Sequence, residues 1–327
     1  MKEKKQTYPI VSICCMAFNH APFIRKCLEG FLMQEPPTGV SADEPWYEIL
    51  IHDDASTDGT DEIIKEYADK YPDRIFPLYE EENQYSKGKV IDLYNYNRAR
   101  GKYIAICEGD DYWTIPDKLR RQVDFMEANP DYSICFHLTR IFETYSGRLR
   151  PFYYDYDKPI DEDEDVTPEY FLRSQVGQPL SIVFKTEAYN FEWYQSFTHY
   201  YDTIEEFLLL REGKGRLLKF IGGQYNLHSG GVSASKPNLN RSLDACLDYV
   251  ELYAYTQDQV LNRFIHDAFI WSYNLCVNNS HIAEWRRLMK KLREQSVVMW
   301  YKVWISIAKQ KLRAMLNNKQ NEKISKS

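Results

Sequence analysis

Residues 97–113 read NRARGKYIAICEGDDYW, and residues 48–60 read EILIHDDASTDGT. In each segment a short apolar run is followed at once by an acidic cluster. A continuous apolar run of this length is typical of a strand that is buried on both faces. Residues 10–17 form such a nearly continuous apolar run, and we predict strands at residues 10–17, 48–52, 75–79 and 103–107.

Helical patterns separate these strands. We expect Asn19 or His20 to cap the first helix, Ser56 and Thr57 to cap the second, and Gly101 to end the third. Alternation of strands and helices indicates a mostly parallel, Rossmann-like central sheet flanked by helices. The fold class predicted here is therefore α/β, with helices at residues 23–34, 60–70, 89–100 and 116–128.

The second half of the chain has a different rhythm. Strand patterns occur at residues 133–143, 178–185 and 217–225, and a helical pattern covers residues 202–211. From about residue 240 to 316 the pattern is helical without further strands. We therefore predict an α/β domain over residues 1–235, followed by a C-terminal helical region with a basic tail over residues 236–327.

Composition excludes several classes of protein. The 327 residues carry a net charge of -7, which argues against a nucleic-acid partner. No run of eighteen apolar residues predicts a membrane-spanning helix, and the N-terminal segment does not resemble a signal peptide. The seven cysteines are scattered without a CxxC spacing, which favours buried free thiols. These features predict a cytoplasmic protein.

Acidic clusters follow two of the predicted strands. Asp53 and Asp54 end the second strand, and Asp110 and Asp111 follow the fourth. Carboxyl ends of parallel strands meet at one edge of a sheet, where ligands of such folds bind. Four carboxylates there would repel each other unless a cation lay between them. Mn²⁺ or Mg²⁺ held together with a diphosphate suits this set of oxygen ligands.

Five segments in this order and spacing resemble the family-2 glycosyltransferases of the GT-A fold. The resemblance covers roughly residues 8–235 and rests on VSICCMAFNH, EILIHDDASTDGT, NRARGKYIAICEGDDYW, HYYDTIEEFLLLREGKG and YNLHSGGVS. It implies a transferase that moves a sugar from a nucleotide-diphospho-sugar, with a UDP-sugar as the first expectation. The implied acceptor is a hydroxyl of a saccharide or of a lipid-linked saccharide.

The resemblance also implies a nucleotide-binding group. Asp53 and Asp54 would hold the base and ribose of the donor, and Ala17 and Asn19 would line the same site. The alternative, from the residues alone, is that the aspartates form a local turn and helix cap.

Metal and sugar contacts are implied at two later motifs. Glu108 and Asp110 take the places of the usual Asp-x-Asp metal motif, and His228 would contact the metal or the diphosphate. Asp111 and Trp113 would lie beside the donor or acceptor sugar. The late motif of the family is commonly Tyr-Arg-x-His, and Asn226 stands here in place of the arginine.

A catalytic base is implied at the start of a helix in the second half. Asp202 occupies that position, with Glu205 and Glu206 as alternatives. A carboxylate there would accept the proton of the acceptor hydroxyl, and direct displacement would invert the anomeric centre.

Two other functions are alternatives to the glycosyltransferase hypothesis. One is a non-catalytic, nucleotide-sugar-binding or scaffolding member of the same fold. The other is a sugar-nucleotidyltransferase, which needs a glycine-rich, basic loop after the first strand, and AFNHAPF is not such a loop. The family resemblance favours a transferase of bacterial surface polysaccharide synthesis, such as capsule, lipopolysaccharide or exopolysaccharide.

The C-terminal segment differs in charge from the rest of the chain. Residues 296–327 contain seven basic residues and one Glu, so this tail carries +6 and the remainder -13. One helical stripe holds apolar side chains, and the basic residues fall outside it. The helix either packs on the catalytic body or makes a peripheral membrane contact through residues 296–316 at the inner face of the membrane. The stripe consists of Val297, Tyr301, Trp304, Ile305, Ala308, Leu312 and Met315.

Overall fold

The computed structural model describes residues 9–151, 162–174, 176–198, 200–231, 238–278 and 281–324, with backbone only at 150–151 and 314–324. The chain divides into two compact units. The first holds residues 1–194 and 200–234, and the second holds residues 195–199 and 235–327. The boundary predicted after residue 235 lies one residue from this division.

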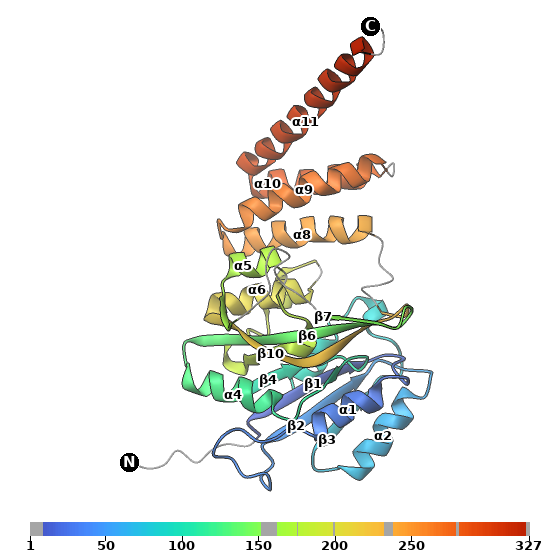
Figure 1. The fold of residues 1–327 in the computed structure, drawn as a ribbon, viewed down its shortest axis with the longest axis vertical. Coiled ribbons are helices and arrows are strands. Elements are labelled where there is room, and N and C mark those ends of the chain that lie inside the picture. The colour runs from blue at the N-terminus through green and yellow to red at the C-terminus, as the bar shows by residue number, and fades with distance from the viewer. Residues whose placement is uncertain are drawn as a thin grey trace. The chain divides into compact units, whose positions relative to one another are not determined.

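The first unit is built on a parallel sheet (Figure 1). Strands β1 (Val11–Ala17), β2 (Tyr47–Asp53), β3 (Ile75–Tyr79) and β4 (Tyr103–Ile106) lie in the order β3-β2-β1-β4 and all pair in parallel. Every residue of β1 and β2 is buried, as continuous apolar runs predict. Helices α1 (Ile24–Leu32) and α2 (Thr60–Lys70) connect these strands.

Later segments extend the same sheet from β4. Strand β9 (Val183–Lys185) runs antiparallel to both β4 and β6 (Tyr132–Glu143), and β6 pairs in parallel with β10 (Lys214–Leu227). Three short antiparallel strands complete the ten strands found among the described residues. These are β5 (Tyr112–Trp113) and β8 (Glu164–Val166), both on β10, and β7 (Arg148–Pro151) on β6. The sheet is mixed, with its longest ladders parallel, and the α/β prediction is confirmed.

Two predicted elements are shorter in the structure. The helix expected at 89–100 is only α3 (Asp92–Tyr96), and the strand expected at 178–185 divides into a 3-10 turn, η2 (Pro179–Ser181), and β9. Gly101 therefore does not end a helix. An added Cβ there would lie 2.4 Å from the backbone nitrogen of Ser12, so the close approach of β1 requires glycine.

The predicted helix caps are wrong. Helix α1 begins after Phe23 and α2 after Gly59, and neither N-cap residue makes a side-chain capping bond. Asn19 and Ser56 instead hydrogen-bond across the two loops, because the chain there turns back before each helix begins. Gly59 adopts φ 93°, a left-handed conformation that glycine reaches without strain.

The remaining elements of the first unit cover the sheet or link its strands. Helix α4 (Lys118–Ala128) contacts β6, and α5 (Pro168–Ser174) contacts α6 (Asp202–Glu212). The 3-10 turns of this unit are η1 (Tyr85–Lys87), η2 and η3 (Thr186–Ala188), and η4 (Trp193–Ser196) spans residues of both units.

The second unit is helical, as predicted. It contains α8 (Asn238–Thr256), α9 (Leu261–Asn278), α10 (Ile282–Gln295) and α11 (Val297–Ile324). Phe269 and Trp285 are buried among them, with the Trp285 indole donating to the carbonyl of Phe269 at 3.0 Å. Among the described helices, none combines the length and the apolar content that crossing a bilayer needs. All seven cysteines are buried free thiols, as expected.

Candidate active site

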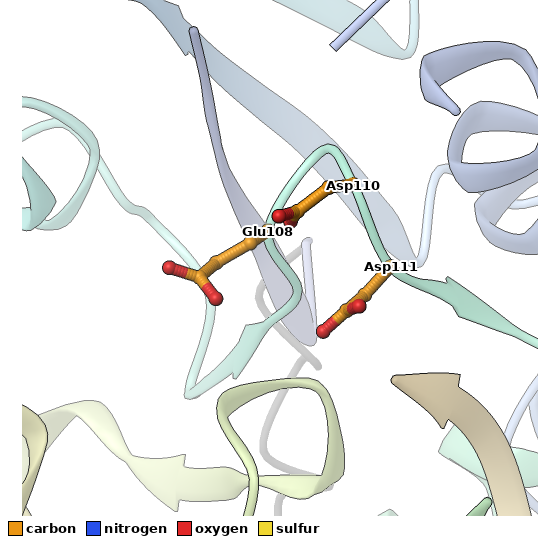
Figure 2. A group of neighbouring side chains, drawn as sticks. All are labelled: Glu108, Asp110 and Asp111. Atoms are coloured by element: carbon orange, nitrogen blue, oxygen red, sulfur yellow. The ribbon is translucent and has the colours of Figure 1, made fainter. Parts of the chain in front are cut away.

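Three carboxylates leave the turn that joins β4 to β5 (Figure 2). One ligand oxygen each from Glu108, Asp110 and Asp111 lies within 4.8 Å of the other two. The turn is fixed to the sheet because the backbone nitrogen of Gly109 donates to the carbonyl of Met16 in β1 at 2.8 Å. The acidic motif is thus a compact group held at the carboxyl edge of the sheet.

The three carboxylates oppose one another's ionisation. Burial and the charge of Asp110 raise the pKa of Glu108 well above its ordinary value, and the same two causes raise the pKa of Asp111. Burial also works against ionisation of Asp110, but the hydrogen bond with His228 and the charge of His20 outweigh it and lower the pKa of Asp110. Asp110 is therefore the carboxylate best stabilised as an anion.

Two histidines face Asp110. The Oδ2 atom of Asp110 lies 2.9 Å from Nε2 of His228, directly after β10, and 3.7 Å from Nε2 of His20, which follows β1. The structure thus brings His228 to the predicted metal motif. Sequence reasoning gave His20 only a capping role, although its place after a buried strand marked it for this edge.

Asn226 holds the acidic turn from the other side. Its backbone nitrogen donates to Oδ1 of Asp111 at 2.7 Å, and its side-chain amide donates to the carbonyl of Asp110 at 2.5 Å. The uncharged amide that stands in place of the family's arginine therefore makes a hydrogen bond to the acidic turn. The amide holds the backbone of Asp110 in place, and the backbone nitrogen of Asn226 orients the Asp111 carboxylate.

The donor set suits a divalent cation. Among the described residues, Oδ1 of Asp110 and Oδ2 of Asp111 are buried oxygens without a hydrogen-bond partner. Buried carboxylate oxygens are normally satisfied, and these two lie in a cluster of three carboxylates. Hard oxygen ligands of this kind match Mg²⁺ or Mn²⁺.

Asp202 opens α6 and belongs to the same electrostatic site. Its charge contributes to the raised pKa values of Glu108 and of Asp92. Solvent reaches the Asp202 side chain, yet enough protein surrounds its carboxylate that this burial raises its pKa. An accessible carboxylate with a raised pKa is suited to accepting a proton.

The two alternative bases are less accessible. The Glu205 side chain is buried and accepts a hydrogen bond from the Tyr96 hydroxyl at 3.0 Å. Glu206 is also buried, and its Oε1 has no partner among the described residues. Of these three candidate bases, Asp202 is the exposed one.

Asp92 is a site residue that sequence reasoning missed. It begins α3, and burial together with the charge of Asp202 raises its pKa to about 7. A single carboxylate inside a segment expected to be helical gives no signal of function by itself. Only the contact of α3 with α6 in the folded protein shows that the charge of Asp202 acts on Asp92.

The loop after β2 is tied together by its own side chains. The carboxylate of Asp53 accepts bonds from the nitrogen and hydroxyl of Ser56, at 3.2 and 2.6 Å. The carboxylate of Asp54 accepts from the backbone nitrogens of Gln84 and Tyr85, at 2.6 and 3.0 Å. Asp53 thus has local structural bonds, as the turn hypothesis foresaw, whereas Asp54 is bonded to a segment 30 and 31 positions further along the chain.

The loops after β1 and β2 interlock and meet the acidic turn. Ala17 accepts a hydrogen bond from the Asp54 nitrogen at 2.9 Å, and Oδ1 of Asn19 accepts from the Thr57 nitrogen at 2.8 Å. An added Cβ on Gly109 would lie 3.2 Å from Cβ of Ala17. The predicted nucleotide group and the predicted metal group therefore adjoin at one sheet edge.

Trp113 is not available to a sugar. Its side chain is 1% exposed, and its indole nitrogen donates to the carbonyl of Leu180 at 2.8 Å. The ring packs edge-on against Phe31, with centroids 4.8 Å apart. The sequence-based role for Trp113 is not supported, because β5 joins the sheet and carries the ring into the core.

The sheet and its acidic turn define a class of protein, the GT-A-like transferases. Staphylococcus aureus TarS, solved in complex with UDP-GlcNAc, has a similar fold with a TM-score of 0.62 at 16% identity, over 88% of this chain and 82% of that chain. A mannosyltransferase from Pyrobaculum calidifontis, solved with GDP-Man and Mn²⁺, gives a TM-score of 0.52 at 16% identity, over 93% and 81%.

The chain belongs to glycosyl transferase family 2, because the sequence model with that description matches residues 12–188, more than half of the chain. An uncharacterized Mycobacterium tuberculosis protein is 33% identical over 177 residues, 54% of this chain and 47% of that protein. The chain thus spans about half the length of the first curated relatives it matches. Escherichia coli WfaP, a UDP-Glc:alpha-D-GlcNAc-diphosphoundecaprenol beta-1,3-glucosyltransferase, is 28% identical over 69% of this chain and 81% of WfaP.

Proposed function

We propose that this protein is a metal-assisted, inverting glycosyltransferase that moves a sugar from a nucleotide-diphospho-sugar to an acceptor hydroxyl. The observation that carries the proposal is the meeting of the carboxylate turn, His228 and Asp202 in one electrostatic site. Family membership and the GT-A-like fold support the same reaction. We propose UDP-sugars first as donors, in line with the UDP-GlcNAc bound in the TarS structure and the UDP-Glc in the name of WfaP.

Glu108, Asp110 and Asp111 would hold Mn²⁺ or Mg²⁺, the two aspartates through the carboxylate oxygens that have no hydrogen-bond partner among the described residues. When bound, the cation would supply positive charge against the charge that grows on the leaving diphosphate. Asn226 keeps Asp110 and Asp111 in place, and His228 holds the Asp110 carboxylate ionised. Asp111 would lie beside the transferred sugar.

Asp202 would act as the base. The acceptor oxygen attacks the anomeric carbon while its proton passes to the Asp202 carboxylate, and the bond from that carbon to the diphosphate oxygen breaks with its electron pair. A single displacement inverts the anomeric centre. The nucleotide would lie along the loops after β1 and β2, near Ala17, Asn19, Asp53 and Asp54.

The pathway proposal follows from the relatives. Bacillus subtilis TuaG, a putative teichuronic acid biosynthesis glycosyltransferase, is 34% identical over 36% of this chain and 42% of TuaG. The name of WfaP includes a lipid diphosphate acceptor. We propose a saccharide or lipid-linked saccharide acceptor, in bacterial surface polysaccharide synthesis at the cytoplasmic face of the membrane.

Release of nucleoside diphosphate tests the proposal. The full chain is incubated with a panel of nucleotide sugars, Mn²⁺ or Mg²⁺ and candidate acceptors, and the Asp202→Asn variant is compared. General-base loss predicts a fall in kcat of about 10²–10⁴-fold, with donor binding retained. Asp43→Asn is the matched control, because Asp43 is exposed and its side chain makes no hydrogen bond or ion pair that the structure describes.

Two results would contradict the proposal. Donor binding without turnover across the panel would favour the non-catalytic alternative. A product whose anomeric proton coupling in NMR shows retained configuration would refute the inverting reaction even if turnover were found.

A further inference from the structure

One face of helix α11 is buried along residues 297–313, where the structure describes its side chains. Met299, Val303 and Ile307 are 3%, 0% and 1% exposed, and their four-residue spacing places them on one side of the helix. That side contacts α9 and α10, where Nε2 of His266 lies 2.8 Å from the hydroxyl of Ser306. The second unit therefore fixes the rotation of α11 about its own axis.

A second apolar stripe lies on the opposite side of α11. Val297, Val298, Tyr301, Ile305 and Leu312 are each at least half exposed, between 50% and 67%. At 3.6 residues per turn these side chains, with Ala308, cover an arc of roughly 100° that excludes the packed face. Trp304 borders this arc, with its ring edge-on to Trp285 at 5.6 Å between centroids. Exposed apolar groups gathered in one stripe mark an interaction surface.

Basic side chains border this stripe. Lys302, Lys309 and Arg313 are exposed along one edge, and Lys311 lies at the other. No Asp or Glu occurs between residues 296 and 321. The tail carries +6 in a chain of net charge -7, so its positive charge is concentrated on this helix and not shared by the rest of the protein.

We propose that the outer face of α11 binds the surface of an anionic lipid bilayer. Apolar and aromatic side chains would enter the interface between headgroups and acyl chains, and the bordering cations would meet lipid phosphates. Charge decides against a second copy of the chain, because two such stripes placed together would bring rows of lysine and arginine into contact. The inference stands apart from the proposed reaction, since it requires neither donor binding nor turnover.

Vesicle sedimentation of the full chain tests the proposal. The protein is mixed with vesicles of phosphatidylcholine alone, or of phosphatidylcholine and phosphatidylglycerol at about 3:1. We expect binding to the anionic vesicles only, weakened by high salt because exposed charges are screened.

Two variants examine the two parts of the surface. Lys302→Glu with Lys309→Glu, and separately Tyr301→Ser with Ile305→Ser, should each weaken binding to anionic vesicles about tenfold or more. The matched controls are Lys290→Glu and Trp271→Ser, which change an exposed cation on α10 and a 51% exposed aromatic ring on α9. Unchanged helical circular dichroism verifies that each variant is folded.

Three outcomes would overturn the proposal. These are no sedimentation with anionic vesicles, binding that both α11 variants retain, and equal loss of binding in the two controls. Light scattering tests whether a second copy of the chain covers the stripe instead. If the wild type were a dimer without vesicle binding, and the Tyr301→Ser and Ile305→Ser changes made it a monomer, the stripe would belong to a dimer interface.

Discussion

Replacing Lys118 with methionine should remove a specific part of the pH dependence of stability. The Lys118 side chain is fully buried, its Nζ lies 3.8 Å from the centre of the Trp113 ring, and among the described residues Nζ has no hydrogen-bond partner. Burial lowers the pKa of Lys118 to about 7. Lys118→Met keeps much of the volume and the contact with Trp113 but carries no charge.

The direction of the pH dependence follows from the number of protons bound at Lys118 in the folded and unfolded chains. An unfolded lysine has a pKa of about 10.4, so between pH 7 and pH 10 the unfolded chain holds a proton at Lys118 that the folded chain has begun to release. The contribution of Lys118 to the free energy of unfolding of the wild type therefore rises with pH across this window. One proton contributes up to about 1.4 kcal/mol per pH unit, and folded Lys118 is half protonated near pH 7, so the gain from pH 7 to pH 9 is about 2 kcal/mol.

Urea unfolding at pH 7, 8 and 9 measures this gain as the difference between wild type and Lys118→Met. Contributions of the neighbouring groups cancel in this difference because both proteins keep them: burial raises the pKa of Cys107 to about 11 and that of Cys135 to about 12, and lowers that of His137 to about 3. A difference between the two proteins that stays constant from pH 7 to pH 9 would refute the reasoning.

Three further changes test the site and its supports. Asp110→Asn should abolish the rise in Tm that Mn²⁺ gives the wild type, as chelation with EDTA should, and an undiminished Mn²⁺ shift would place the metal elsewhere. Asn226→Ala removes the bond to the Asp110 carbonyl, so the Mn²⁺ concentration for half-maximal activity should rise about tenfold; a change only in kcat would contradict that positioning role. Tyr96→Phe leaves the buried Glu205 carboxylate without its donor and should lower the free energy of unfolding by about 1–3 kcal/mol in urea titrations, against no measurable loss for Asp43→Asn.

The parallel half of the sheet could be predicted closely because its signals are local. The bounds expected for residues 60–70 and 75–79 coincide with α2 and β3, since a strand shows a short apolar run and a helix shows a repeat near 3.6 residues. The same signals placed the Glu108 to Asp111 turn at a strand end. Strand β5 was missed, because two residues are too few to show a period.

Contacts between segments that are distant in the sequence could not be predicted from these local patterns. Asp92 joins the field of Asp202 across 110 positions of chain, and His20 reaches Asp110 from a loop that looked like a helix start. The burial of Trp113 likewise depends on β10, which pairs with β5 from more than a hundred residues away. The sequence around each of these residues does not indicate which distant residue it will contact.

The C-terminal helix shows most plainly which features follow from the sequence and which depend on the tertiary structure. Its amino-acid sequence alone determined that residues 297–316 would be helical, amphipathic and basic, and composition fixed the charge contrast with the rest of the chain. Only the tertiary structure decided which apolar stripe packs, and it buried Met299, Val303 and Ile307 while leaving Tyr301, Ile305 and their neighbours exposed. The side chain of Met315, predicted within the exposed stripe, lies outside the described residues. The physical reason is that periodicity reports the angle between side chains around a helix, whereas burial depends on the shape of the helices that meet it.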